Sequence, residues 1–491
     1  TLIVMKKKNW LLVAILGIVV FALGMLANSI MQRRAESQHL STANNNLKPF
    51  ESRNEIWEEF YPREYQSWKQ TSDTTFRSKH MSSGMVDALK ERPEMVILWA
   101  GYPFAKDYGE PRGHYYAIQD VTNTLRTGAP NEKDPGPQPG TCWTCKSPDV
   151  PRMMNKMGVA NFYKTKWSAL GHEVTNSVGC ADCHDQKTMN LTITRPSLVE
   201  AFQRNGKDIK QATHQEMRSL VCAQCHVEYY FKGEGKYLTL PWDNGKTVEQ
   251  MEAYYDNVKH VDFEHKLSKT PILKAQHPDY EIFQMGVHAQ RGVSCADCHM
   301  PYKSEGGVKF TDHHITSPLA NMNNTCQVCH RESEAVLAQN VYERQDMVIN
   351  LRNRLEKQLV KAHLKAKFLW DNGANATEMK PVLDYIRKAQ WRWDYIAASH
   401  GAAFHAPLES QRVLADGMFN AMEADNTMNL LIDRKKLSGK FIMPDINTKE
   451  KAQKFIGLDI PAERAAKAKF LKTVVPEWIK KAKAQGTLVM N

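Results

Sequence analysis

The sequence predicts a mainly α-helical, loop-rich fold with little β-sheet, and three observations lead to that expectation. Between about residues 50 and 340, apolar stretches are short and are interrupted by Pro and Gly, as in EKDPGPQPGTCW and GGVKFTDHHITSP. Few segments alternate apolar and polar residues in the way that strands do. Towards the C-terminus, apolar residues recur at three-to-four spacing over long segments, which predicts long helices.

The N-terminus has the pattern of an export segment. Lys6, Lys7 and Lys8 form a basic region, the run Trp10–Leu26 is apolar throughout, and a polar stretch follows. The run is at the short end for a membrane-spanning helix, so a cleaved signal peptide and a retained anchor both stay open. In either case we expect the folded part to lie in the periplasm.

We expect three regions along the chain. Residues 1–39 hold the export signal or anchor and the start of a polar, Asn-rich linker that continues to about residue 50, residues 40–340 hold every cysteine, and residues 341–491 hold long helices. The segments with helical periodicity are Glu332–Trp370, Glu378–His405 and Pro407–Lys436. These helices are expected to pack on the cysteine-bearing region and to form the interface of a homodimer; a solvated surface helix is the alternative.

All ten cysteines fall into five C-x-x-C pairs. The motifs are CWTCK (Cys142, Cys145, Lys146), CADCH (Cys180, Cys183, His184), CAQCH (Cys222, Cys225, His226), CADCH (Cys295, Cys298, His299) and CQVCH (Cys326, Cys329, His330). C-x-x-C-H is the attachment motif of c-type haem, in which two thiols bind the haem vinyl groups and the next side chain ligates the iron. Zinc ribbons and disulfides also use cysteine pairs, but neither requires a histidine directly afterwards. Only 18 of the 491 residues are histidine, so four such adjacencies by chance are very improbable.

The pattern therefore predicts a multihaem cytochrome c domain with five c-type haems. Haem that only transfers electrons takes two axial ligands, so each of the four histidine motifs needs a second ligand from elsewhere in the chain. The sequence offers fourteen further histidines, which is enough for four bis-histidine haems. Their assignment to individual haems does not follow from the sequence.

Lys146 stands where the other four motifs have histidine. A lysine amine ligates iron only when it is neutral, although its free pKa is about 10.4, so lysine is an unusual choice for an electron wire. It suits an iron whose opposite face stays open for substrate. The alternatives are a solvated Lys146 with some other iron ligand, or a motif that holds no haem.

One C-x-x-C-K motif followed by four C-x-x-C-H motifs, in that order, resembles the pentahaem, ammonia-forming cytochrome c nitrite reductases of the periplasm. The resemblance covers almost the whole chain after the export segment. It includes RGHYYAIQDVTNTLRTGAP before the first motif, CAQCHVEYYF at the third and TPILKAQHPDYEIFQMGVHAQRGVSCADCH at the fourth.

The resemblance implies a role for particular residues. Lys146 would be the proximal ligand of the catalytic haem, and Arg126, Tyr229 and His277 would surround substrate on its open face. Glu228 and Gln276 match side-chain ligands of a bound Ca²⁺, completed by the backbone carbonyls of Tyr229 and Lys274; oxygen donors suit this cation. The second axial ligands would be His114, His288, His314 and His405, with His313 a close rival of His314 and His400 of His405.

The resemblance also implies the activity, which is six-electron reduction of nitrite to ammonium, with hydroxylamine, nitric oxide and sulfite as further substrates. The electron donor would be a quinol-oxidising multihaem membrane cytochrome or a soluble multihaem cytochrome. Two other hypotheses remain: an electron-transfer cytochrome, or a related multihaem enzyme that acts on hydroxylamine or sulfur oxyanions. The formal net charge of +11 does not indicate nucleic acid, because the basic residues are scattered and no nucleic-acid module is present.

Overall fold

The computed structural model describes residues 7–42 and 47–489. Its first helix, α1 (Lys7–Thr42), contains the segment Leu12–Gln32, which is long and apolar enough to cross a membrane, with a mean hydropathy of 2.4 and none of it buried. Both an export signal and an anchor have this composition. The basic start of the expected export segment lies partly outside the described residues, as does most of the expected linker, whose first residues belong to α1.

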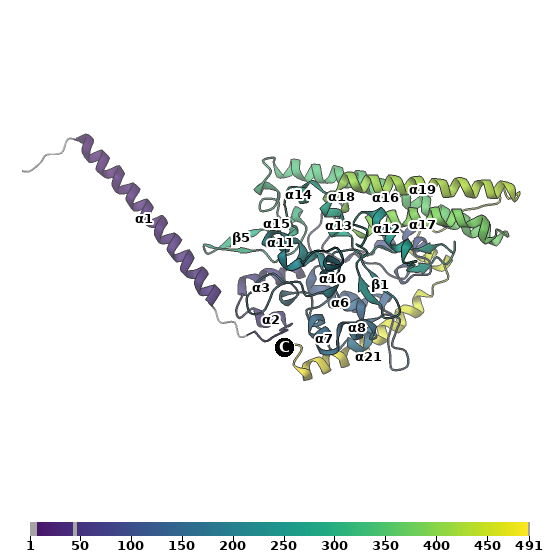
Figure 1. Ribbon diagram of the computed structural model, residues 1–491, viewed down its shortest axis with the longest axis horizontal. Coiled ribbons are helices and arrows are strands. Elements are labelled where there is room, and N and C mark those ends of the chain that lie inside the picture. The colour runs from purple at the N-terminus through teal and green to yellow at the C-terminus, as the bar shows by residue number, and fades with distance from the viewer. Residues whose placement is uncertain (1–6, 43–46, 490–491) are drawn as a thin grey trace, which may run out of the picture.

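The cysteine-bearing region consists of short helices joined by loops (Figure 1). The helices are α2 (Asn54–Trp57), α3 (Pro62–Lys69), α4 (Ala88–Glu91), α5 (Glu94–Leu98), α6 (Ala117–Asn123), α7 (Asp149–Met157), α8 (Val159–Lys164), α9 (Cys180–Cys183), α10 (Pro196–Arg204), α11 (His214–Ala223), α12 (Val248–Asn257), α13 (Asp279–Gln284), α14 (Val287–Gln290) and α15 (Cys295–His299). Two short 3₁₀ helices carry residues of the site, η4 (Leu125–Thr127) and η5 (Gly140–Trp143).

The sheet content of the described residues is three antiparallel two-stranded ribbons. They pair β1 (Tyr230–Lys232) with β2 (Tyr237–Thr239), β3 (Phe263–Glu264) with β4 (Pro271–Ile272), and β5 (Tyr302–Glu305) with β6 (Val308–Thr311). The expectation of a mainly α-helical, loop-rich fold with little sheet is confirmed.

Long helices dominate the C-terminal part, as predicted. They are α16 (Glu334–Asp371), α17 (Ala376–Ala398), α18 (Ala402–His405), α19 (Pro407–Arg434), α20 (Lys449–Phe455) and α21 (Ile460–Gln485). In Figure 1, α16, α17 and α19 lie side by side along one edge of the molecule, while α21 runs along the opposite side, next to α6 and η4. The sequence analysis did not identify α21.

The periodicity predicts one helix over Glu378–His405. The structure has two there, α17 and α18. The chain breaks between Ala398 and Ala402, where Asp279 accepts hydrogen bonds from the Ser399 hydroxyl (2.6 Å) and the Gly401 amide (3.4 Å). A Cβ atom at Gly401 would lie 2.2 Å from the ring of His405, so only glycine fits this close passage. The break turns His405 towards the cysteine-bearing region.

One hydrophobic core joins the cysteine-bearing region to the long helices. It includes Leu98 of α5, Trp242, Leu355 of α16 and Trp391 of α17, all of them essentially inaccessible to solvent. A second cluster packs Trp143 and Trp167 of the first motif's surroundings against Phe470 and Trp478 of α21. The C-terminal helices therefore form part of the structure that shapes the motifs.

Candidate functional site

In four places in the cysteine-bearing region, two histidine rings lie opposite each other. Their ring centres are 6.0 to 6.3 Å apart, and the pairs are His114–His226, His184–His313, His288–His330 and His299–His405. An imidazole nitrogen binds a first-row metal at about 2 Å and lies about 1.1 Å from its ring centre, so two rings on one metal have centres about 6 Å apart. Every pair joins a motif histidine to a histidine from elsewhere. The arrangement fits four irons, each between two imidazoles.

The geometry favours His313, and not the predicted His314, as the partner of His184. The Nδ1 atom of His313 is 2.7 Å from the Thr311 carbonyl, which leaves Nε2 on the other side of the ring. His314 instead lines a cavity of about 180 Å³, together with Lys303 and His299. Adjacent residues of an irregular segment direct their side chains to different sides, so the choice between the two depended on the backbone path. The other three predicted partners, His114, His288 and His405, do lie opposite a motif histidine.

Three of these rings are oriented by backbone carbonyls. The Nδ1 atoms of His184, His299 and His313 lie 2.8, 2.9 and 2.7 Å from the carbonyl oxygens of Met189, Thr316 and Thr311. When Nδ1–H donates to a carbonyl, Nε2 keeps its lone pair for a metal. Burial, reinforced by the facing His313 ring, lowers the pKa of His184 to about 4 and keeps it in the neutral, ligating form.

The cysteines show which motifs are neighbours. None of the ten forms a disulfide. Cys145 of the first motif contacts Cys225 of the third, and Cys222 of the third contacts Cys295 of the fourth. The second motif approaches the third through Cys183, and the fifth approaches the fourth through Cys326. The third motif is thus at the centre, with the first, second and fourth around it, and c-type haems attached to these thiols would be close neighbours.

Lys146 lies in a tightly built loop. Gly140 at the start of η5 passes so close to α8 that a Cβ there would meet the Phe162 carbonyl at 2.2 Å. Trp143 stacks on Trp167 with ring centres 4.8 Å apart and donates from Nε1 to its carbonyl oxygen at 2.9 Å. The Lys146 amide donates to the Trp143 carbonyl at 2.9 Å. These contacts fix the turn that presents both thiols and the lysine.

Arg126 is linked to the first motif through Gln138. The Gln138 amide donates to the Arg126 carbonyl at 3.0 Å, and its oxygen lies 3.1 Å from the Cys142 sulfur. The guanidinium lies over the Phe104 ring at 4.5 Å, and its Nε is 3.3 Å from the Thr124 hydroxyl. Stacking and hydrogen bonding hold the charged group without neutralising it by a carboxylate.

Tyr229, directly before β1, and His277, in the loop before α13, are brought to the same motif. The Tyr229 hydroxyl is buried beside Cys145 and Cys142, and burial first and then these neighbours raise its pKa. His277 lies near Lys146, and burial lowers the pKa of the His277 ring well below its usual range. Tyr229 therefore keeps its proton, and His277 is neutral. Arg126, Tyr229 and His277 thus all lie near the first motif, which carries Lys146.

Three of the residues predicted to hold calcium, Glu228, Gln276 and Lys274, lie together. Glu228 is inaccessible to solvent, and its carboxylate accepts from the Gln276 amide at 2.6 Å and from the Tyr255 hydroxyl at 2.9 Å. The Gln276 side chain lies 3.1 Å from the Lys274 carbonyl. Burial, opposed by these hydrogen bonds and reinforced by the carboxylates of Glu281 and Asp262, raises the pKa of Glu228. A buried carboxylate among carboxylates and carbonyls fits a hard cation such as Ca²⁺.

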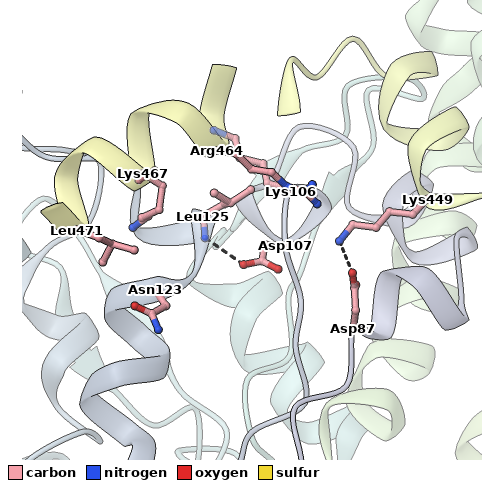
Figure 2. Close-up of a pocket in the computed structure, with 10 residues that line it drawn as sticks. Asp87, Lys106, Asp107, Asn123, Leu125, Lys449, Arg464, Lys467 and Leu471 are labelled. Carbon is pink, nitrogen blue, oxygen red and sulfur yellow. Dashed lines mark hydrogen bonds and ion pairs between the residues drawn. The ribbon is translucent and has the colours of Figure 1, made fainter. Parts of the chain in front are cut away.

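A cavity of about 320 Å³ lies behind the segment that carries Arg126 (Figure 2). Its charged lining is Asp87, Lys106, Asp107, Lys449, Arg464 and Lys467. Figure 2 shows Lys467 on α21 next to Leu125, whose amide donates to Asp107 at 3.0 Å. Arg126 itself does not line this cavity, so the cavity borders the site but does not contain it.

Comparisons with known proteins identify the family. A sequence profile of the cytochrome c552 family matches residues 53–486. The chain belongs to that family. Cytochrome c-552 of Parabacteroides distasonis is 61% identical over 493 residues, which cover 99% of this chain and 100% of the relative. Cytochrome c-552 of Bacteroides thetaiotaomicron is 61% identical over 495 residues, with the same coverage of each chain.

A solved structure similar to this cytochrome c552 is the cytochrome c nitrite reductase of Desulfovibrio desulfuricans, whose catalytic subunit is described with two calcium sites. The two chains superpose with a TM-score of 0.75 at 30% sequence identity, and the match covers 85% of this chain and 91% of the other. The fold is therefore that of a cytochrome c nitrite reductase.

Proposed function

We propose that this cytochrome c552 reduces nitrite to ammonium at a lysine-ligated c-type haem that receives electrons through four bis-histidine haems. The observation that carries the proposal is the contrast between the motifs. The four histidine motifs each have a second histidine opposite the motif histidine, whereas the first motif has Lys146 with Arg126, Tyr229 and His277 around it. Similarity to the nitrite reductase of Desulfovibrio desulfuricans supports the same reaction.

Five haems would be held by the ten cysteines, with Lys146 and the eight paired histidines as axial ligands. When bound, c-type haem supplies redox-active iron. The reaction consumes one nitrite, six electrons and eight protons, and it yields one ammonium ion and two water molecules. The contacts among motifs imply a branched arrangement in which electrons reach the first motif through the third.

The side chains around Lys146 have separate tasks. Arg126 is permanently charged and attracts the nitrite anion, donating hydrogen bonds to its oxygens. His277 is neutral and donates an N–H to the substrate, and it can pass on a proton as N–O bonds break. Tyr229 keeps its proton because it is buried, and it offers a second donor. Together they supply charge and protons to a small anion.

A calcium ion would be held by Glu228, the Gln276 side chain and the carbonyls of Tyr229 and Lys274. Glu228 directly precedes Tyr229 in the chain, and Gln276 directly precedes His277, so two of the calcium ligands are next to residues that would contact substrate. Binding the ion would therefore fix both donors with respect to the substrate.

We place the protein in the periplasm, delivered by α1, which would be removed as a signal or kept as an anchor. Its electron donor would be a quinol-oxidising multihaem membrane cytochrome or a soluble multihaem cytochrome, and we expect a homodimer.

The test is nitrite reduction by the purified, haem-loaded protein with reduced methyl viologen as electron source, with ammonium as the measured product. Ammonium formation is expected, and a fully haem-loaded protein that forms none would overturn the proposal. Lys146→His is the companion variant. It should lose at least about tenfold in turnover, and its high-spin haem signal should be altered, because the proximal ligand changes from an amine to an imidazole while the opposite face stays without a histidine.

A further inference from the structure

Arg195 is a buried cation that belongs to none of the haem motifs. It precedes α10 and is inaccessible to solvent. Its Nε donates to the Thr144 carbonyl at 2.6 Å, and its Nη2 donates to the Ser147 carbonyl at 2.9 Å. These two carbonyls flank Cys145 and Lys146. The guanidinium therefore holds both sides of the short segment that presents the lysine.

The same guanidinium contacts the second motif. Nη2 donates to Oδ1 of Asp182, the third residue of CADCH, at 2.5 Å, and the other carboxylate oxygen accepts from the Gly179 amide at 2.9 Å. Nη1 donates to the Thr194 hydroxyl at 2.5 Å. A buried charge is costly unless it is paired and hydrogen-bonded. Every nitrogen of this guanidinium donates at least one hydrogen bond, and Nη2 is paired with the Asp182 carboxylate.

The backbone of Arg195 contacts the third motif. Gln224, the third residue of CAQCH, accepts from the amides of Thr194 at 3.0 Å and Arg195 at 3.2 Å. The side-chain amide of Gln224 donates to the Asp182 carbonyl at 2.8 Å. Three motifs, the first, second and third, are thus joined at one residue, and they are joined through positions that lie between their cysteines.

The fourth motif, a second CADCH, offers an internal comparison. Its Asp297 pairs with Arg218 at 3.0 Å and accepts from the Ser294 amide at 2.7 Å, as Asp182 does with Arg195 and Gly179. The remaining contact of Arg218 is with Tyr302, whose ring lies 5.2 Å from the guanidinium. An aspartate–arginine pair is therefore common to both CADCH motifs, whereas the bridge to the lysine motif is specific to Arg195.

We propose that Arg195 is a positioning residue for the lysine-ligated haem. It fixes the Thr144–Ser147 segment, and with it the direction of Lys146, and it locks that segment to the second and third motifs. A planar guanidinium reaches two carbonyls and a carboxylate at once, which the single ammonium group of lysine cannot do. The inference rests on the proposed function in that it assumes haem at the first motif.

The test compares Arg195→Lys with Arg218→Lys in the haem-loaded protein. Both substitutions keep the positive charge but remove the planar guanidinium with its several N–H donors. R195K is expected to alter the high-spin electron paramagnetic resonance signal of the resting protein and to lower kcat for nitrite by about 10- to 100-fold, with a much smaller change in KM because Arg126 is untouched. R218K is expected to keep the wild-type high-spin signal and kcat.

An R195K protein with five haems, a wild-type high-spin signal and a wild-type kcat would overturn the proposal. If R195K binds fewer haems, Asp182→Asn serves instead, since it removes the charge that orients the guanidinium while keeping the side chain's shape. D182N should alter the same signal, and an unchanged signal there would equally count against the proposal. A wild-type protein that forms no ammonium would refute the proposed function but would leave the spectroscopic comparison intact.

Discussion

A histidine that ligates iron must be neutral and must present the correct nitrogen, and for His184 and His299 the structure meets both requirements with short local contacts. The carbonyls of Met189 and Thr316 take the Nδ1–H of His184 and His299, and burial disfavours the charged form of both rings. Lys146 has no such ring to orient, so its direction depends on the backbone of its own loop. That difference is why an arginine reaching the carbonyls of the loop matters there.

The first prediction concerns the neighbours His313 and His314. His313→Ala should convert one of the four low-spin bis-histidine haems to a high-spin form, because the ring opposite His184 is removed. His314→Ala is the control and should leave all four low-spin signals in place. Electron paramagnetic resonance of the two variants distinguishes the assignments. Loss of a low-spin signal in the His314 variant alone would restore the original prediction.

The second prediction concerns Lys467, which lies behind Arg126. Its buried ammonium group donates to the Thr122 carbonyl in α6 at 3.1 Å and to the Thr127 hydroxyl in η4 at 3.0 Å. Lys467→Met should leave these acceptors unpaired, at a cost of about 1–3 kcal/mol. The melting temperature should fall, and kcat/KM for nitrite should decrease because Arg126 is less firmly held.

The control for this variant is Lys469→Met on the exposed side of the same helix. It should change neither the melting temperature nor kcat/KM. Equal behaviour of the two variants would show that Lys467 does not support the Arg126 segment.

At the scale of elements, three of the long helices, α16, α17 and α21, begin at side-chain caps. Ser333 caps α16 by accepting from the Val336 amide, Asn375 and Glu378 form a capping box on α17, and Asp459 accepts from the Ala462 amide at the start of α21. These caps fix where each helix starts and hence which residues meet the haem motifs.

Two buried histidines join α16 and α17 to the rest of the protein. The rings of His265 and His363 stack at 3.7 Å, and neither is accessible to solvent. His265 is 2.7 Å from the Ile97 carbonyl. His363 donates from Nε2 to Gln390, whose amide donates to the Leu98 carbonyl, and its Nδ1 accepts from the Ser268 hydroxyl. The stack has room for two neutral rings but no partner for a charged one.

The third prediction follows from this stack. Burial lowers the pKa of His363 to about 4, below its value of about 6.5 in an unfolded chain. The unfolded state therefore binds the proton more tightly, and stability that is present above pH 6.5 is lost as the pH falls towards 4. Between pH 6.5 and 4, the free energy of unfolding of His363→Gln should fall by about 3 kcal/mol less than that of the wild type, because glutamine cannot be protonated.

The measurement is the free energy of unfolding by denaturant at several pH values. His214→Gln, at an exposed position in α11, is the control and should follow the wild-type pH dependence. If the His363 variant also followed it, the stack would not be the acid-sensitive element.

At the scale of the whole molecule, the outer face of the long helices is apolar. The exposed apolar residues of α19 are Leu408, Phe419, Met422 and Leu430. At 3.6 residues per turn they fall on one narrow stripe along the helix. The exposed residues Val336 and Met347 form a similar line on α16, three turns apart. Exposed apolar residues aligned in this way are typical of a protein interface and support the proposed homodimer.

The fourth prediction tests that interface. Phe419→Glu places a charge in the middle of the stripe and should shift the haem-loaded protein from dimer to monomer in analytical ultracentrifugation, because an unpaired charge in an apolar contact is unfavourable. Ile442→Glu, at an exposed apolar residue outside the long helices, should leave the mass unchanged. A Phe419 variant with the wild-type mass would exclude this surface.

Sequence patterns predicted α16 and α19 to within a few residues, since both are long, periodic and uninterrupted. They predicted one helix where α17 and α18 are two, because the break at Gly401 answers to contacts with Asp279 and His405 that lie far away in sequence. They missed α21, whose amphipathic pattern is weak, although Asp459 and the proline after it form a recognisable start. Nothing in the sequence distinguished Arg195 or Lys467 from other basic residues.

Local sequence spacing was enough to predict the haem chemistry, because haem attachment needs residues at fixed spacing: five cysteine pairs, four with histidine and one with lysine. It also determined the helical class and the family. Only the tertiary structure decided which distant residues face each other, such as His313 with His184 and Arg195 with the Lys146 loop. Those choices depend on the path of the backbone and on packing between segments up to hundreds of residues apart, and local spacing carries no record of either.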